Sequence, residues 1–331
     1  MLAARYYAPG DIRVEDVPVP IPRDRQVLVR IQAAGICGSD MHNYRIGMFM
    51  TYAPVTVGHE FCGVVCETGP LVSAVKPGDF VVADSRVYCT QCPHCQSGQV
   101  NRCCSLGFLG EVCDGGFAEY ALLEEHQLFK LPAGIAPEQA ALLEPLSVAL
   151  HIWEKAKRVS QKRLAIVGAG PIGQLVTQVS AALSDTEILI VEPSPARRSA
   201  AKNLGAHRAI SPDETEQYTD WADCVIEAVG KTAALESAFN LASIGSTVVL
   251  AGLFEETFGG DMNLVTEKEL HVCGVNGFTT QNMADAIALT HKKTLDPSAV
   301  ISQRFPLRET RQAFETMNDA GRCPGKVLVL P

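Results

Sequence analysis

The chain has 331 residues, of which 47% are hydrophobic and 20% charged, so it is long enough for two domains with sizeable cores. Its formal net charge of −9 argues against nucleic acid as a partner, because phosphate binding requires a basic surface. No basic run suggests an anionic membrane surface, and the sequence contains neither a low-complexity segment nor a repeat of fixed period.

One uncharged stretch, residues 164–183, has the length of a membrane span. It contains glycines, a proline and two glutamines, and it divides naturally into a strand, a tight turn and a helix. We therefore expect no membrane-spanning segment. The chain begins without a charged and apolar export segment, so we expect a cytoplasmic protein with reduced cysteines.

The first third of the chain is rich in short apolar runs broken by glycine and proline. Gln26–Ala33 alternates like a half-buried strand, and Phe61–Val65 and Phe80–Ala83 also resemble strands. Pro77-Gly78-Asp79 indicates a turn before the last of these. Because helical patterns are sparse here, we expect a β-rich, barrel-like domain.

A polar loop after these strands carries Cys89, Cys92, Cys95 and Cys103 in a C-x2-C-x2-C-x7-C run. Four thiolates this close in sequence can bind one tetrahedral zinc ion, which would hold a loop that lacks a hydrophobic core. The alternative is a disulfide cluster, which a reduced compartment disfavours. The neighbouring Cys104 competes with Cys103 as the fourth ligand. The remaining cysteines are scattered: Cys37, Cys62, Cys66, Cys113, Cys224, Cys273 and Cys323.

The pattern changes near Pro145, where strand and helix candidates begin to alternate. The expected strands are Arg163–Val167, Glu187–Val191, Ala209–Ile210, Cys224–Glu227, Thr247–Leu250 and His271–Gly274. The expected helices between them are Ile172–Leu183, Ala196–Leu204 and Ala233–Ala242. This alternation predicts an α/β domain with a parallel, doubly wound sheet over residues 146–284.

From about Ala284 the pattern gives a helix, a further helix and a final strand, Lys326–Leu330. We expect this tail to return to the first domain. That domain would then be discontinuous, comprising residues 1–145 and 285–331, with a zinc lobe at about 89–103.

Residues 168–173 read G-x-G-x-x-G after a strand and at the start of a helix, the context in which this motif binds dinucleotides. Its glycines allow a tight turn, approach of the pyrophosphate and close helix packing, and helix amides face the phosphates. Glu192 ends the next strand and would accept the ribose hydroxyls of NAD. Arg197 can cover the adenine or reach a phosphate. The candidate contacts are Gly168, Gly170, Pro171, Ile172, Gly173, Glu192 and Arg197.

A zinc ion that takes part in a reaction needs three protein ligands and an open position. The candidates are Cys37, His59, Glu60 and Glu144. Spacing alone is weak support for them, because single cysteine and histidine residues are usually structural.

In its motifs and their order, the sequence resembles the zinc-dependent medium-chain dehydrogenases. These motifs are GICGSD, GHE, the four-cysteine loop, DGGFAEY, EPLSVALH and GAGPIG. EPLSV-x-x-H and the segment Arg304–Leu307 are similar to the sorbitol, polyol and sugar-acid (aldonate) branch. The resemblance covers essentially the whole chain and implies a GroES-like β-barrel catalytic domain plus a Rossmann domain.

The resemblance implies that Cys37 and His59 bind the catalytic zinc, with Glu60 and Glu144 beside it as ligands or through its water. Ser39 and His42 match a proton relay, and Arg304 matches a substrate-contacting arginine.

Asn43 departs from the tyrosine of sorbitol dehydrogenases, which puts sorbitol itself in question. Tyr44-Arg45 is similar to the pair found in relatives grouped with aldonate dehydrogenases. Arg45 can pair with a substrate carboxylate or be a solvated surface residue.

The resemblance thus implies two zinc ions per chain and NAD-dependent oxidation of a secondary hydroxyl of a polyol or sugar acid. An alcohol or L-threonine dehydrogenase of the same fold is the alternative, and a non-catalytic cofactor-binding protein is a further one. We expect a homo-oligomer, either a dimer or a tetramer.

Overall fold

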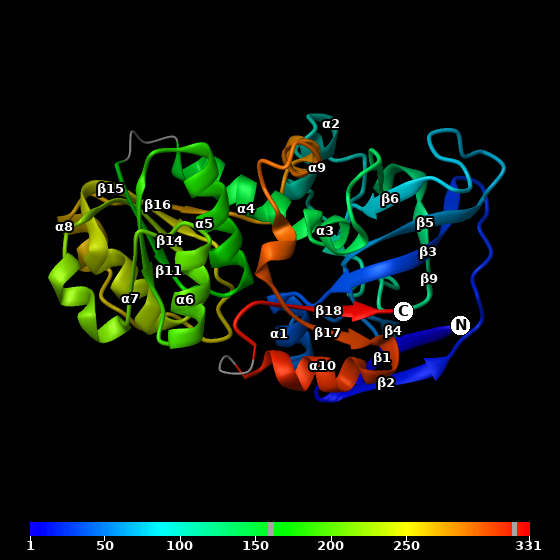
Figure 1. Ribbon diagram of the computed structural model, residues 1–331, viewed down its shortest axis with the longest axis horizontal. Coiled ribbons are helices and arrows are strands. Elements are labelled where there is room, and N and C mark those ends of the chain that lie inside the picture. Colours follow the sequence, from blue (N-terminus) through cyan, green and yellow to red (C-terminus); the bar gives the residue numbers. More distant parts are fainter. Residues whose placement is uncertain (158–161, 320–322) are drawn as a thin grey trace. The chain divides into compact units, whose positions relative to one another are not determined.

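The structure is a computed structural model that describes residues 1–157, 162–319 and 323–331 (Figure 1). The chain forms two compact units, which we describe separately. The first contains Met1–Pro145 and Thr279–Pro331, and the second contains Leu146–Phe278.

The first unit is built mainly on antiparallel sheets, and its largest sheet has seven strands. In that sheet the order is β10 (Leu128–Lys130), β6 (Phe80–Ala83), β5 (Glu60–Thr68), β3 (Gln26–Gly35), β18 (Lys326–Leu330) and β17 (Ile301–Pro306), with β9 (Tyr120–Glu124) also paired to β3. A three-stranded sheet contains β2 (Asp11–Asp16), β1 (Leu2–Ala8) and β4 (Val55–Thr56), and β7 (Arg86–Val87) pairs with β8 (Gly107–Phe108). The β-rich first domain predicted from the sequence is confirmed.

The helices of the first unit are short and connect or cover these sheets. They are α1 (Gly38–Ile46), α2 (Pro93–Gln96), α3 (Pro137–Ala141), α9 (Thr280–His291) and α10 (Thr310–Met317). Single 3-10 turns lie at η1 (Val100–Arg102), η2 (Glu125–Gln127), η4 (Pro297–Val300) and η5 (Leu307–Glu309).

The C-terminal segment completes the first unit. Strand β18 pairs antiparallel with β3, with Val329 opposite Ala34, and it also pairs with β17. In the hydrophobic core, Phe314 of α10 packs against Phe117 with ring centroids 6.0 Å apart. The chain re-enters this unit at Thr279 rather than at residue 285, because α9 begins there with a Thr279 side-chain cap.

The second unit is a six-stranded sheet in which every pairing is parallel. Its order is β13 (Arg208–Ile210), β12 (Glu187–Val191), β11 (Arg163–Val167), β14 (Ala222–Glu227), β15 (Ala242–Leu250) and β16 (His271–Gly274). The helical segments are α5 (Pro171–Leu183), α6 (Pro195–Asn203), η3 (Pro212–Tyr218), α7 (Thr232–Leu241) and α8 (Asn263–Glu267), while α4 (Leu143–Ala156) contains the division point. This is the order of a doubly wound dinucleotide-binding sheet.

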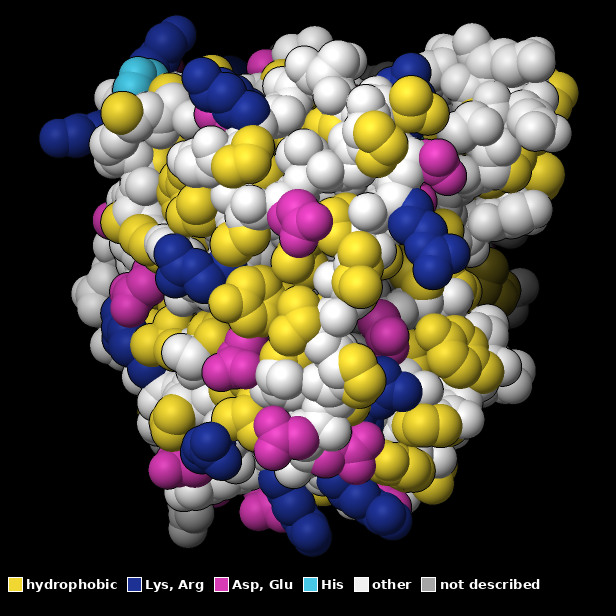
Figure 2. Space-filling model, turned by 90° about the vertical axis from the view of Figure 1, so that its right-hand side faces the viewer, with side chains coloured by type: hydrophobic (Ala, Val, Ile, Leu, Met, Phe, Trp, Pro, Cys, Tyr) yellow, Lys and Arg dark blue, Asp and Glu magenta, His cyan; other side chains and the backbone are white. Residues whose placement is uncertain are grey.

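The central strands of this sheet are almost uninterrupted apolar runs, because they are covered on both faces. In β11, Leu164, Ala165 and Ile166 have no exposed surface. The uncharged stretch 164–183 is therefore β11 followed by α5, as predicted. No helix in the described parts of the chain is long and apolar enough to cross a bilayer. On the face shown in Figure 2, acidic and basic side chains are interspersed with apolar ones.

Candidate functional site

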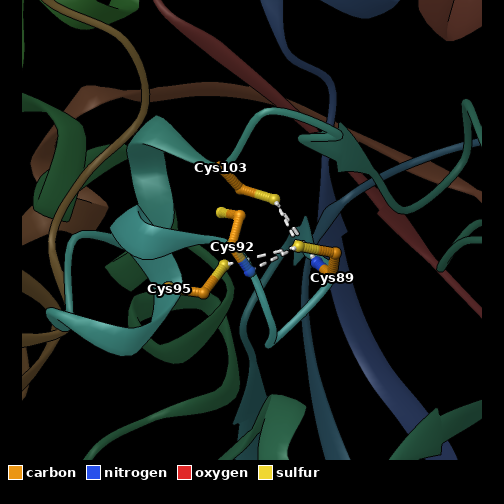
Figure 3. Close-up of side chains that lie close together, drawn as sticks. All are labelled: Cys89, Cys92, Cys95 and Cys103. Atoms are coloured by element: carbon orange, nitrogen blue, oxygen red, sulfur yellow. Dashed lines mark hydrogen bonds between the residues drawn. The ribbon is translucent and has the colours of Figure 1, made fainter.

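The four-cysteine loop brings its thiols together within one small lobe. Cys92 precedes α2 and Cys95 lies in it, whereas Cys103 follows η1 (Figure 3). The four sulfur atoms, including that of Cys89, all lie within 4.8 Å of one another. The Sγ atom of Cys89 is 3.5 Å from that of Cys103 and 4.0 Å from that of Cys95.

These distances fit a tetrahedral metal centre, because Zn–S bonds of about 2.3 Å place neighbouring sulfur atoms about 3.8 Å apart. Backbone amides of Cys92 and Cys89 donate to the sulfur atoms of Cys89 and Cys103, both at 3.3 Å, and thereby favour thiolates. The amides of Cys104 and Cys95 lower the pKa of Cys92 to about 5. All residues of α2 are at least partly exposed, so this helix buries no side chain that could hold the lobe.

The exposed Cys104 lies outside this group, and its sulfur is 3.8 Å from the hydroxyl of Ser105. The twelve cysteines all lie in described segments, and all are free thiols.

A second candidate metal group joins residues that are distant in sequence. Ligand atoms of Cys37, His59 and Glu60 lie within 4.8 Å of one another. Cys37 precedes α1, and His59 comes directly before Glu60, the first residue of β5. His59 and Glu60 are buried, whereas Cys37 is half-buried. One thiol, one imidazole and one carboxylate are the donor types of a catalytic zinc site.

Asp40 orients the histidine of this group. Its Oδ1 atom is 3.5 Å from Nδ1 of His59, and its Oδ2 atom accepts the amide of Cys37 at 2.8 Å. Burial alone would lower the pKa of His59, but the charges of Asp40 and Cys37 outweigh burial and raise it well above its usual value. With Nδ1 facing Asp40, Nε2 is the nitrogen left for a metal.

Lys326 holds the carboxylate of the group from the last strand of the chain. Its Nζ atom lies 2.7 and 2.8 Å from the two oxygens of Glu60 and donates to the carbonyl of Ile36 at 3.0 Å. Both charged side chains are almost fully buried. The ion pair with Glu60 keeps the pKa of Lys326 raised, although burial by itself lowers it.

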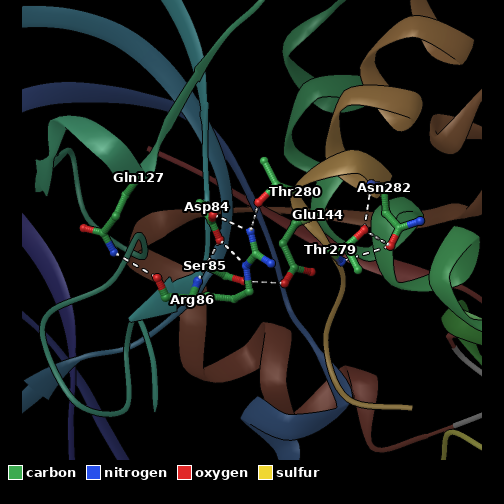
Figure 4. A network of polar contacts seen from close by, with 8 residues as sticks. All are labelled: Asp84, Ser85, Arg86, Gln127, Glu144, Thr279, Thr280 and Asn282. Carbon is green, nitrogen blue, oxygen red and sulfur yellow. Dashed lines mark hydrogen bonds and ion pairs between the residues drawn. The ribbon is translucent and has the colours of Figure 1, made fainter. Parts of the chain in front are cut away.

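Glu144 is a further carboxyl group close to Glu60 and His59. Among the described residues it is not part of the set within 4.8 Å, and its carboxylate accepts the hydroxyl of Ser85 at 2.6 Å (Figure 4). Burial chiefly, together with the charge of Glu60, raises the pKa of Glu144 to about 7, while His59 acts in the opposite direction.

The neighbouring network fixes the segment between β6 and β7, which carries Ser85. Arg86 donates to Asp84 at 2.8 and 2.7 Å and to Thr280 of α9 at 3.4 Å (Figure 4). Asp40, Lys326 and Ser85 are supporting residues that the sequence motifs do not predict. Asp40 lies within the GICGSD motif, but Lys326 becomes relevant only through the pairing of β18 with β3.

Helix α1 carries the candidate proton relay. Ser39 and His42 are both half-buried on it. Nη2 of Arg45 is 3.2 Å from Nδ1 of His42. Because arginine can only donate, Nδ1 accepts, and the proton of neutral His42 lies on Nε2. Arg45 also donates to Asn318 at 3.5 Å.

Two of the candidate substrate residues, Tyr44 and Arg304, contact other side chains of the protein. The Tyr44 ring packs on the hydrophobic core, 5.4 Å from the Phe314 ring between centroids, which gives it a packing role. Arg304, on β17, donates through two nitrogens to Glu138 of α3, both at 2.6 Å. Because this pairing occupies two donors of its guanidinium, the geometry favours a structural role for Arg304.

Asn43 fixes the segment that follows α1. Its side chain is buried, donates to Glu111 at 3.1 Å and accepts the amide of Phe49 at 2.9 Å. Thr51 donates through its hydroxyl to the carbonyl of Glu111 at 3.0 Å. The residue that departs from the sorbitol dehydrogenase pattern therefore holds the segment that follows α1.

In the second unit, the glycine motif forms the turn between β11 and α5. Gly168 has a φ of 99°, and a Cβ on Gly173 would lie only 2.0 Å from the carbonyl oxygen of Gly168. Gly170 precedes α5, Pro171 is its first residue and Ile172 its second. Only glycine permits this close packing, which leaves the helix N-terminus open to a phosphate.

Glu192 lies at the end of β12, beside this turn. Its two carboxylate oxygens accept the amides of Ala169 at 2.8 Å and Ser194 at 3.0 Å. Arg197 is half-buried on α6, and its Nε atom has no hydrogen-bond partner among the described residues. The turn, the carboxylate and the arginine thus fit a dinucleotide.

Comparison with known proteins identifies the family. The alcohol dehydrogenase GroES-like domain matches residues 23–133, and the zinc-binding dehydrogenase domain matches residues 171–292. An L-threonine 3-dehydrogenase of Bacillus velezensis is 32% identical, covering 96% of this chain and 95% of its own. The chain belongs to the zinc-dependent medium-chain dehydrogenases.

Other relatives place this dehydrogenase in the polyol and sugar-acid branch. A sorbitol dehydrogenase of Macaca fascicularis is 31% identical over 94% of this chain and 90% of its own. A 2-dehydro-3-deoxy-L-galactonate 5-dehydrogenase of Pseudoalteromonas atlantica is 32% identical over 96% and 95%. A zinc-binding dehydrogenase of Sinorhizobium meliloti, solved bound to NADP, has a TM-score of 0.92 and 32% identity, covering 100% of this chain and 99% of its own.

Membership of this family makes the protein an oxidoreductase that acts on a small molecule with zinc and a nicotinamide cofactor. It also confirms the predicted GroES-like and Rossmann architecture.

Proposed function

We propose that this dehydrogenase oxidises a secondary hydroxyl of a polyol or sugar acid to a ketone and reduces NAD. The observation that carries the proposal is the convergence of Cys37, His59 and Glu60 in a chain whose relatives include a sorbitol dehydrogenase and a 2-dehydro-3-deoxy-L-galactonate 5-dehydrogenase. A zinc ion bound there would polarise the hydroxyl and favour loss of its proton, and the nicotinamide would accept a hydride from the carbon that carries the hydroxyl.

The protein's own residues prepare this chemistry. The carboxylate of Asp40 lies 3.5 Å from Nδ1 of His59, and Lys326 fixes the orientation of Glu60. The half-buried thiol and the buried imidazole and carboxylate thus present their donor atoms at fixed positions. Glu144, held by Ser85, supplies a further negative charge beside them, as a direct ligand or through water.

We assign the departing proton to Ser39 and His42. Because Arg45 donates to Nδ1 of His42, the imidazole exchanges protons through Nε2 and can pass them toward solvent. Of the three predicted substrate residues we retain Arg45, because Tyr44 packs on the hydrophobic core and Arg304 is paired with Glu138. The exposed Arg45 is also the one whose place beside His42 best suits a substrate carboxylate.

NAD is the proposed acceptor because Glu192, a buried carboxylate, follows directly after β12. A carboxylate accepts two ribose hydroxyls but repels a 2′-phosphate. NADP is the competing cofactor, since the Sinorhizobium meliloti relative was solved with it. We further propose two zinc ions per chain, the second bound by Cys89, Cys92, Cys95 and Cys103.

L-threonine is the second candidate substrate, because the Bacillus velezensis relative is a threonine dehydrogenase. The experiment that separates the candidates is reduction of NAD and of NADP across polyols, aldonates, threonine and ethanol at fixed pH. We expect NADH formation with a polyol or an aldonate. Turnover of threonine or ethanol alone would contradict the proposal.

A further inference from the structure

A fully buried carboxylate, Glu227, ends β14 at the carboxyl edge of the parallel sheet and has no part in the proposed hydride transfer. Its Oε1 atom accepts the amides of Val229 and Gly230, both at 2.8 Å. Its Oε2 atom has no hydrogen-bond partner among the residues that the structure describes. Because burying a carboxylate is costly, a local function for this one is to be expected.

Glu227 joins two loops that follow neighbouring strands. Its backbone carbonyl accepts the amides of Ala251 and Gly252, at 2.8 and 3.0 Å, from the loop after β15. A Cβ on Gly252 would lie 2.6 Å from Oε2 of Glu227. A Cβ on Gly230 would lie 2.1 Å from the carbonyl oxygen of Leu253. The two loops therefore pack backbone against backbone over the carboxylate.

The first of these loops also touches the glycine turn. A Cβ on Gly168 would lie 2.5 Å from Cγ2 of Val229, so this side chain fills the space beside the first glycine of the motif. The amide of Ala228 donates to the carbonyl of Val167 at 2.9 Å. Val229 and Leu253 are 37% and 44% exposed, although both are apolar. Their side chains form an apolar surface at the edge where a doubly wound sheet binds its ligand.

We propose that Glu227 is a positioning residue for the dinucleotide: by holding Val229 and Gly230, it fixes the apolar surface beside the glycine turn. This inference rests on the proposed use of a nicotinamide dinucleotide. Loss of the carboxylate would free two amides and let the loop move relative to Gly168. Such a change weakens cofactor binding more than it slows the chemical step.

The test is the equilibrium dissociation constant of NADH, measured by fluorescence titration of Glu227→Leu, Glu227→Gln and the unchanged enzyme. Asp223→Leu is the matched control, because Asp223 lies on the same strand and accepts the amides of Lys162 and Arg163 at 2.8 and 3.0 Å. Both leucine variants remove an acceptor of two backbone amides. Only Glu227→Leu does so at the carboxyl edge of the sheet, where the cofactor is proposed to bind.

We expect the Kd of Glu227→Leu to rise about tenfold, as for the loss of one charge-assisted hydrogen bond. Glu227→Gln, which keeps an acceptor oxygen, should stay within about threefold, and Asp223→Leu within about twofold. The KM for NAD should rise in parallel, with a smaller change in kcat. An unchanged Kd in Glu227→Leu, or an equal rise in Asp223→Leu, would overturn the inference.

If Glu227→Leu fails to fold, Glu227→Asp takes its place, because it withdraws the carboxylate by one methylene. A rise of about fivefold is then expected, and a Kd within about twofold of the unchanged enzyme overturns the inference. An unchanged enzyme that binds neither NADH nor NADPH would instead overturn the proposed function and, with it, the basis of this inference.

Discussion

The two candidate metal groups are assembled in opposite ways. The four thiols come from one loop, residues 89–103, in a lobe whose helix buries no residue. The group of Cys37, His59 and Glu60 is drawn from two elements and is held by Lys326 from the end of the chain. We therefore expect the first to depend on a bound metal for local order, whereas the second depends on the fold for its geometry.

The largest effect that separates the two groups is expected from Cys37→Ser. It should lower turnover about a thousandfold, because several kcal/mol of Lewis-acid stabilisation would be lost. NADH binding should be unchanged, because the glycine turn lies in the other unit. Steady-state kinetics and NADH titration measure both, with the exposed Cys66→Ser as the control. Retained turnover would refute the catalytic assignment.

Lys326→Met tests whether the second group depends on the fold. Removing one partner of a buried ion pair leaves Glu60 uncompensated and should lower the free energy of unfolding by about 3–5 kcal/mol. Urea unfolding provides the measurement. Lys130→Met is the control, because Lys130 pairs with Asp79 at 2.8 Å but is 55% exposed, so its loss should cost about 0–1 kcal/mol. Equal losses of unfolding free energy in the two variants would show that the buried ion pair matters no more than the exposed one.

Cys92→Ser tests the metal dependence of the lobe. The zinc content should fall from two ions per chain to one, and the lobe should become sensitive to proteolysis, because its helix buries no side chain that could replace the metal. Elemental analysis and limited proteolysis follow these changes. Cys104→Ser should alter neither, since its sulfur lies outside the group. Two zinc ions in Cys92→Ser would count against the structural site.

The smallest expected effect is on the pH dependence of stability, and it concerns Glu227, a buried carboxylate outside the two candidate metal groups. Burial raises the pKa of Glu227 above its usual value of 4.5, although the amides of Gly230 and Val229 act in the opposite direction. The protonated form therefore stabilises the fold below about pH 4.5, and this contribution is lost as the pH rises through the folded-state pKa.

Glu227→Gln should consequently gain stability relative to the unchanged enzyme as the pH rises from 4 to 8. Thermal unfolding without cofactor, recorded across that range, checks this expectation. Parallel stability curves for the two proteins would show that Glu227 does not titrate as argued.

The difference between a site built from one loop and a site assembled by the fold also explains what could be predicted from the sequence. The cysteine spacing and the glycine motif are local patterns, so the amino-acid sequence alone locates Cys89 to Cys103 and residues 168–173. The strands and helices of the second unit follow from apolar periodicity, although β15 begins at Ala242, earlier than the expected Thr247.

The supporting residues could not be predicted in this way. Lys326 reaches Glu60 only because β18 pairs with β3, which are far apart in sequence. In the sequence, Glu227 looks like the last residue of an ordinary buried strand. Only its contacts with two loop amides in the structure indicate a further role. The motif around Arg304 predicts a substrate contact, whereas the structure pairs this arginine with Glu138 of a distant helix.

The most direct test is anomalous diffraction at the zinc absorption edge from crystals of this dehydrogenase grown with Zn²⁺. We predict two peaks per chain, one among the four thiols and one beside Cys37, His59 and Glu60. A peak at the thiols alone, with those three side chains turned apart, would contradict the catalytic centre from which the proposed reaction is derived.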